Sequence, residues 1–96
     1  MADEQEKPTL LEEADTSTDT LPPYKVILHN DDVNEFGYVV RTVYKITPLS
    51  RQEAYRKVLE AHETGVALLL VCHKERAELY QDQLHSCGLT VTIEPD

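Results

Sequence analysis

The fold is decided by the stretch YKVILHNDD, which occupies residues 24–32. Its first five residues alternate in character, with Tyr24, Val26 and Leu28 on one face, and this period of two predicts a β-strand. A short polar segment, residues 29–32, follows the strand and precedes a helical pattern. We therefore expect the polar segment to lie at the end of a strand, beside the start of a helix.

Two helices are predicted directly after this segment. Apolar residues recur at helical spacing over residues 35–46, and Asn34 is expected to cap the start of that helix. Ser50 and Glu53 then form a capping box, which indicates the start of a second helix. Gly65 is placed to close it, because glycine readily adopts the left-handed conformation that ends many helices.

The second half of the chain adds a strand, a helix and a strand. Val66–Cys72 is an unbroken apolar run of strand length, so we expect it to be the central strand, covered on at least one side. Residues 74–85 predict a third helix closed by Gly88, and Leu89–Ile93 alternates as a last strand. The order β-α-α-β-α-β predicts an α+β domain in which three helices pack on a small, mainly antiparallel sheet of three strands.

Length and charge restrict the class of protein. The 96 residues are enough for one small domain, and the net charge of −9 would be repelled by a nucleic-acid backbone. No apolar run approaches the roughly 18 residues that a membrane span needs. The acidic N-terminus resembles neither a secretory signal nor a transit peptide, so the cytoplasm is the expected location. Cys72 and Cys87, the only cysteines, are expected to be reduced and inert.

The N-terminal segment differs in composition from the rest. Residues 1–23 hold seven acids and one base, a net charge of −6, which leaves −3 for the remaining chain. With little to bury, residues 1–22 are expected to form a disordered acidic tail, and residues 23–96 to form the folded domain.

The polar segment after the first strand is the candidate site. Asn30, Asp31 and Asp32 would form a polar mouth that prefers a cation with several N–H donors, and His62 follows at the edge of a helix. A polar mouth over an apolar floor suits the first residue of a peptide, which has an amine beside a side chain. The competing interpretation is that these residues only cap and turn the chain.

Catalysis and metal binding are not indicated. The four histidines, His29, His62, His73 and His85, and Cys72 lack the spacing of a zinc site. No serine or cysteine lies in a nucleophile-elbow motif, and no glycine-rich phosphate loop is present. The residues therefore predict a small binding domain without cofactor or metal, and not an enzyme.

Two segments give the chain a resemblance to a known family. PPYKVILHNDD, residues 22–32, and LEAHETG, residues 59–65, resemble the two signatures of ClpS, the adaptor of Clp proteases, and the likeness runs over residues 22–94. The resemblance implies a protein that binds the N-terminal residue of N-degron substrates and delivers them to the N-terminal domain of the ClpA or ClpC unfoldase. It further implies substrates that begin with Phe, Tyr, Trp or Leu, and a monomer is expected.

The resemblance also assigns roles to residues. Asn30, Asp32 and His62 match the groups that hold the substrate α-amine, with Asp31 beside them. Glu75 matches a family acid that contacts the unfoldase, and Tyr80 stands where the family often has lysine. The implied lining of the side-chain pocket is Asn34, Phe36, Val39, Val58, Ala61 and Leu89.

The chain departs from the family pattern in the pocket. Phe36 stands where methionine is usual, and Val58 and Ala61 stand where methionine and valine are usual. A rigid Phe36 narrows the entrance, whereas the smaller Val58 and Ala61 deepen the floor. Two alternatives stay open: a regulatory domain that docks on the unfoldase without binding N-degrons, and, more remotely, a small hydrolase.

Overall fold

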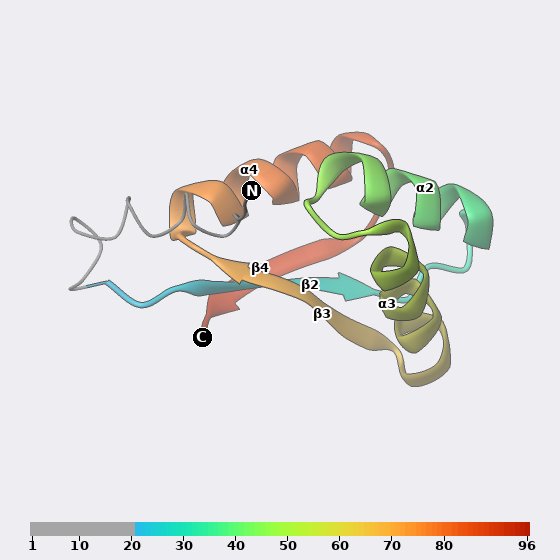
Figure 1. Cartoon of the computed structure of the whole chain (residues 1–96), viewed down its shortest axis with the longest axis horizontal. Coiled ribbons are helices and arrows are strands. Elements are labelled where there is room, and N and C mark those ends of the chain that lie inside the picture. Colours follow the sequence, from blue (N-terminus) through green and yellow to red (C-terminus); the bar gives the residue numbers. More distant parts are fainter. Residues whose placement is uncertain (1–20) are drawn as a thin grey trace, which may run out of the picture.

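The computed structural model describes residues 21–96 and has the predicted order of elements (Figure 1). The α+β class and the order β-α-α-β-α-β are confirmed. The expected acidic tail, residues 1–22, lies outside the described residues except for its last two. The elements are β2 (Tyr24–His29), α2 (Phe36–Ile46), α3 (Arg51–Thr64), β3 (Val66–Cys72), α4 (Lys74–Ser86) and β4 (Val91–Pro95).

The strands form one antiparallel sheet with β2 in the middle. The order is β3-β2-β4, and β2 pairs antiparallel with both neighbours. The prediction that Val66–Cys72 is the central strand was wrong, because β3 lies at an edge. Its side chains alternate between buried and exposed along much of the strand, so only one face of this apolar run is covered.

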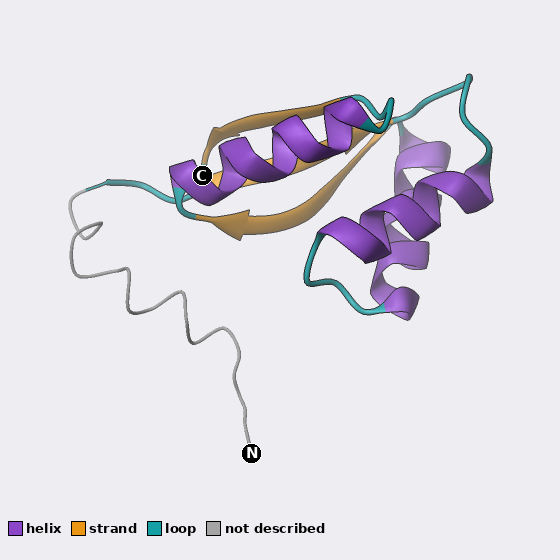
Figure 2. Cartoon of the chain, turned by 90° about the horizontal axis from the view of Figure 1, so that it is seen from above, coloured by secondary structure: helices purple, strands orange, loops and turns teal. Residues whose placement is uncertain are grey.

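The helices cover one face and one end of the sheet. Helix α4 runs along the sheet, whereas α2 and α3 pack together near the end where β2 stops and β3 starts (Figure 2). This arrangement sets the end of β2 beside the start of α2 and the end of α3. The core lies between the sheet and the helices, and its largest fully buried side chains are Leu28, Leu84, Val26, Val43 and Val91.

The opposite face of β3 remains open within the described chain. Val66 is 46% exposed, and Leu68 and Val71 are each 38% exposed. The register of β2 against β3 shifts between Val26 and Ile27, an irregularity of the kind that a β-bulge produces. The sheet therefore has an apolar outer surface along one edge strand.

The ends of the helices agree with the sequence signals in part. The capping box of Ser50 and Glu53 is present at the start of α3, and Gly65 has φ 100°, a left-handed conformation. The prediction that Asn34 caps α2 was wrong. Glu35 occupies the N-cap position without a side-chain hydrogen bond, because the Asn34 side chain is used in the preceding turn.

Both cysteines are free thiols. Cys72 is buried, and desolvation raises the pKa of its thiol to about 11, so it stays protonated at neutral pH. Among residues 21–96, no helix combines the length and the apolar character needed to cross a membrane. The same residues hold no group of three or more His, Cys, Asp or Glu side chains placed to bind a metal ion.

Candidate functional site

The turn after β2 is organised by the carboxylate of Asp31. Its Oδ1 accepts hydrogen bonds from the backbone N–H groups of Val33, at 2.7 Å, and Asn34, at 3.1 Å. Its Oδ2 accepts a further hydrogen bond from the Asn34 side-chain amide. These bonds hold the pKa of Asp31 below its ordinary value, and the Asn34 side chain is the largest cause. The carboxylate of Asp31 therefore serves the turn itself.

The Asn34 amide also ties this turn to the other side of the domain. Its Nδ2 donates to the backbone carbonyl of Gly88 at 2.9 Å, across the loop between α4 and β4. Gly88 has φ 90°, and a Cβ there would stand 3.7 Å from Asn34 Nδ2. Asn34 thus connects the loop before α2 to the loop after α4, and both loops are held in one arrangement.

Asn30 and Asp32 remain turned toward solvent. The side-chain amide of Asn30 donates to Asp32 Oδ1 across a long 3.4 Å, and the side chains of both residues are exposed. The backbone N–H of Asn30 donates to the carbonyl of Gly65 at 2.9 Å. The backbone of Asn30 is therefore fixed, while most of the oxygen atoms of Asn30 and Asp32 stay available as acceptors.

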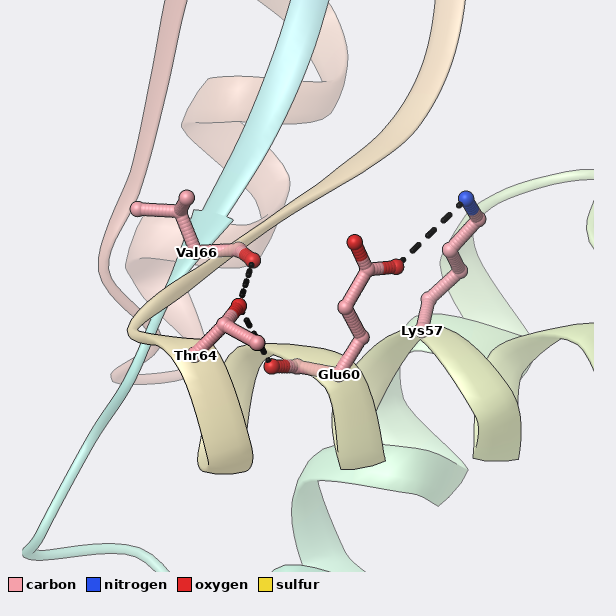
Figure 3. Close-up of polar contacts among 4 residues, drawn as sticks. All are labelled: Lys57, Glu60, Thr64 and Val66. Atoms are coloured by element: carbon pink, nitrogen blue, oxygen red, sulfur yellow. Dashed lines mark hydrogen bonds and ion pairs between the residues drawn. The ribbon is translucent and has the colours of Figure 1, made fainter.

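The end of α3 supports this position and carries His62. Thr64 Oγ1 lies 2.9 Å from the carbonyl oxygen of Glu60 and 3.0 Å from that of Val66. Figure 3 draws both contacts as dashed lines. One turn of helix earlier, Lys57 Nζ lies 3.8 Å from a carboxylate oxygen of Glu60. The Thr64 hydroxyl therefore joins the last turn of α3 to the first residue of β3. Gly65, whose backbone carbonyl accepts the hydrogen bond from the Asn30 N–H, lies between these two elements.

Aromatic rings form one wall of the site. The Phe36 ring meets the Tyr55 ring edge to face, with centroids 5.5 Å apart and planes at 81°. It meets the His62 ring in the same manner, with centroids 6.3 Å apart and planes at 78°. Such perpendicular contacts are favourable for aromatic pairs. Phe36, at the start of α2, therefore packs edge to face against the imidazole of His62.

These groups surround one cavity of about 230 Å³. Its apolar wall includes Phe36, Val39, Val58 and Ala61, and the last three of these are buried. Sequence reasoning missed Leu28, which lines the cavity near the end of β2, and it gave His29 no role of its own within the polar segment. The complete lining is Leu28, His29, Asn30, Asp31, Asp32, Asn34, Phe36, Val39, Val58, Ala61 and His62.

Three predicted site residues do not line this cavity. Leu89 is not among the lining residues, and its side chain is 3% exposed in the core. Tyr80 is also a core residue at 9% exposure, and burial raises the pKa of its phenol. Tyr80 therefore presents little surface to a partner. Glu75 is exposed in the first turn of α4, where a partner can reach it.

The lowered pKa of Asp31 predicts an acid-sensitive turn. In the unfolded chain this carboxyl titrates near its ordinary value of about 3.9, so the folded state binds the proton less tightly. The stabilisation is present above about pH 4 and is lost as the pH falls through the lowered pKa. We expect wild type to be more stable than Asp31→Asn at neutral pH, and the difference to shrink in acid.

Urea unfolding of both proteins over a series of pH values measures this effect. In an Asn34→Ala background, much of the acid-sensitive stability that Asp31 contributes should be lost, since the Asn34 side chain is the largest cause of the lowered pKa of Asp31. A stability difference between wild type and Asp31→Asn that stays constant into acid would contradict the prediction.

Comparisons with known proteins place the chain in a family. A family model described as "ATP-dependent Clp protease adaptor protein ClpS" matches residues 19–92. The chain is 53% identical over 76 residues to the ATP-dependent Clp protease adapter protein ClpS of Synechococcus sp. (strain CC9902), an alignment that covers 78% of this chain and 73% of the relative. It is 42% identical over 87 residues to the adapter protein ClpS of Gloeobacter violaceus, covering 90% of this chain and 94% of the relative.

A solved structure has the same fold. Agrobacterium tumefaciens ClpS2 bound to L-phenylalaninamide superimposes with a TM-score of 0.68 at 28% sequence identity, and the match covers 78% of this chain and 98% of that one. The family match covers most of the chain and includes both the segment after β2 and the end of α3. The chain therefore belongs to the ClpS family of Clp protease adaptors.

Proposed function

We propose that this protein binds the N-terminal residue of N-degron substrates and delivers them to a Clp AAA+ unfoldase. The observation that carries the proposal is the composition of the cavity. Amide and carboxylate oxygens and one imidazole lie at the same cavity as an apolar wall. This combination fits a free α-amine that is attached to a large hydrophobic side chain.

The polar side of the cavity suits an α-ammonium group. Such a group offers three N–H donors, and Asn30 Oδ1, the Asp32 carboxylate and a neutral His62 ring nitrogen are the matching acceptors. The Asp31 carboxylate is already engaged by Val33 and Asn34. We therefore assign Asp31 a positioning role, in which it holds the turn that presents its neighbours.

The apolar side suits a single side chain. A cavity of about 230 Å³ is smaller than the roughly 300–1,000 Å³ typical of sites for drug-sized ligands. Phe36 stands against His62, whereas Val39, Val58 and Ala61 are buried behind the opening. L-phenylalaninamide, which the related ClpS2 binds, carries a free amine beside a benzyl group. We propose that first residues Phe, Tyr, Trp and Leu are the ligands here.

The partner side of the proposal rests on the relatives and on α4. The relatives are named as adapter proteins of a protease, and this agrees with a binding role instead of a catalytic one. Glu75 is exposed at the start of α4, and Glu78 and Asp82 line the same shallow surface. We propose this surface of α4, which holds Glu75, Glu78 and Asp82 beside Arg76, as the contact with the N-terminal domain of ClpA or ClpC, in the cytoplasm.

Calorimetric titration with peptides that differ only in their first residue tests the proposal. A Phe- or Leu-initiated peptide should bind with micromolar affinity or better, about 8 kcal/mol. Replacing that residue by glycine should cost about 1.5–3 kcal/mol, because a large side chain no longer enters the cavity. Equal affinity for all first residues would reject the proposal, and unfoldase binding without peptide binding would favour a purely regulatory domain.

Removing the charge of Asp32 should weaken peptide binding. We expect Asp32→Asn to cost about 1.5–3 kcal/mol, the value of a hydrogen bond to a charged group. Asp82→Asn is the matched control, since it makes the same change at an exposed residue of α4, away from the cavity. The same titration measures both variants. If Asp82→Asn weakened binding as much as Asp32→Asn, the effect would be one of net charge, and the assignment of Asp32 would fail.

A further inference from the structure

A second groove lies on the exposed side of α2 and shares no lining residue with the peptide cavity. It encloses about 590 Å³, and its lining combines cations with aromatic and aliphatic side chains. Its aromatic residues are Tyr38 and Tyr44, and Tyr44 is 42% exposed. The lining contains no acidic residue. The groove is therefore basic and partly apolar.

The cations of this groove are Arg41, Lys45 and Arg51, three of the eight bases that follow the acidic N-terminal segment. Arg41 and Lys45 lie four positions apart on one helix, a spacing that brings like charges together and destabilises a helix. The Arg51 guanidinium lies 5.1 Å from the centre of the Tyr44 ring. Within residues 21–96, none of the three forms an ion pair with a carboxylate; the ion pairs there join Lys25 to Glu94 and Lys57 to Glu60.

The N-terminal segment has the complementary composition. It carries seven acids and one base, and the stretch Leu10–Glu13 reads LLEE, two large apolar residues followed by two carboxylates. The side chains of the groove offer the matching surfaces: tyrosine rings and Val40 for the leucines, and cations for the glutamates. The segment is covalently attached, and a flexible linker long enough to span two sites gives an effective concentration on the order of millimolar.

The length of chain before Leu21 sets how far this stretch can reach. Leu10–Glu13 lies eight to eleven positions before Leu21, the first described residue, and a fully extended chain of that length spans up to about 26–36 Å. The domain measures 40 × 30 × 23 Å. We propose that Leu10–Glu13 docks in cis on the groove formed by Tyr38, Val40, Arg41, Tyr44, Lys45 and Arg51. While docked, the acidic segment is held against α2 and is not free for another protein.

Two-dimensional NMR of the full chain, without peptide, tests this contact. In Glu12→Gln/Glu13→Gln, the backbone amides of residues 38–45 and of Arg51 should shift, because two carboxylates leave the groove. Adding salt to about 1 M, where the Debye length is about 3 Å, should move the same amides of wild type toward the positions seen in the variant. The variant itself should respond much less to salt.

Matched charge removals identify the groove as the partner. Arg41→Gln/Lys45→Gln should abolish the response of these amides to the Glu12 and Glu13 substitutions. Arg56→Gln/Lys57→Gln removes the same charge from α3 and should leave that response intact. The proposal is overturned if the groove amides do not respond, if both double variants behave alike, or if the shifts depend on protein concentration and so report a second copy. None of these outcomes bears on peptide binding at the other cavity.

Discussion

Acetylating the amine of a Phe-initiated peptide should weaken its binding to this protein by about 2–5 kcal/mol. Acetylation removes the positive charge and leaves one N–H where three were present. Asp32, Asn30 and His62 would then be covered by the ligand without full hydrogen bonding, and unpaired polar groups are costly to desolvate. At 1.4 kcal/mol for each factor of ten, the loss is roughly 30- to several-thousand-fold in affinity.

Competition of the free and acetylated peptides against a fluorescent Phe-initiated peptide measures this loss. The control is the same peptide acetylated on a lysine side chain further along, which adds the same group but keeps the free α-amine. The control should bind like the parent peptide. If the two acetylated peptides lost affinity equally, the free amine would not be the recognised group, and the assignment of the polar side of the cavity would fail.

Replacing Leu84 by alanine should destabilise the fold by about 2–5 kcal/mol, the usual cost of removing a buried leucine side chain. Leu84 is fully buried between α4 and the sheet, at 0% exposure. Domains of this size have total stabilities of roughly 5–15 kcal/mol, so the loss is a large share. The midpoint of urea unfolding should fall, with little change in the slope of the unfolding free energy against urea concentration.

Leu79→Ala makes the identical substitution on the same helix at a side chain that is 44% exposed. Its cost should stay within about 0.5 kcal/mol, as for most surface substitutions. Similar costs for the two variants would mean that α4 does not pack on the sheet as described here.

The sequence patterns predicted the elements well and their arrangement less well. The capping box at Ser50 and the left-handed Gly65 are local signals, and both have the expected geometry. Strand order is not local. An apolar run such as Val66–Cys72 fits a strand covered on both faces, but also an edge strand with an exposed apolar side. The pairing of β2 with both β3 and β4 leaves β3 at the edge of the sheet. That pairing depends on contacts between residues that are far apart in the sequence.

Asn34 shows why a polar side chain next to a helix is hard to assign. Asparagine is a favourable N-cap, and its position before residues 35–46 suggested that role. In the structure its amide instead bonds Asp31 and the carbonyl of Gly88, a residue 54 positions away. A partner that distant leaves no sign in the local pattern, so the cap was predicted and the cross-connection was not.

The candidate cavity could be predicted in outline because its residues come from two short segments. The cavity is lined by the polar residues that follow β2 and by His62. Phe36, Val39, Val58 and Ala61 line it as well. Leu28 was missed, although its alternation in the strand places it on the inner face. The family resemblance supplied the expected pocket lining, and of that lining Leu89 is not at the cavity, because its side chain is part of the core. Their ligand-binding roles remain proposals.

Strand β3 also affects how the protein should be handled at high concentration. It is an edge strand of seven residues, VALLLVC, without a charged side chain, and one row of its backbone donors and acceptors faces away from β2. Uncharged apolar edges of this kind promote strand-to-strand aggregation between molecules. The net charge of −9 opposes such encounters at neutral pH. Colloidal stability should therefore decline as acid neutralises the carboxylates.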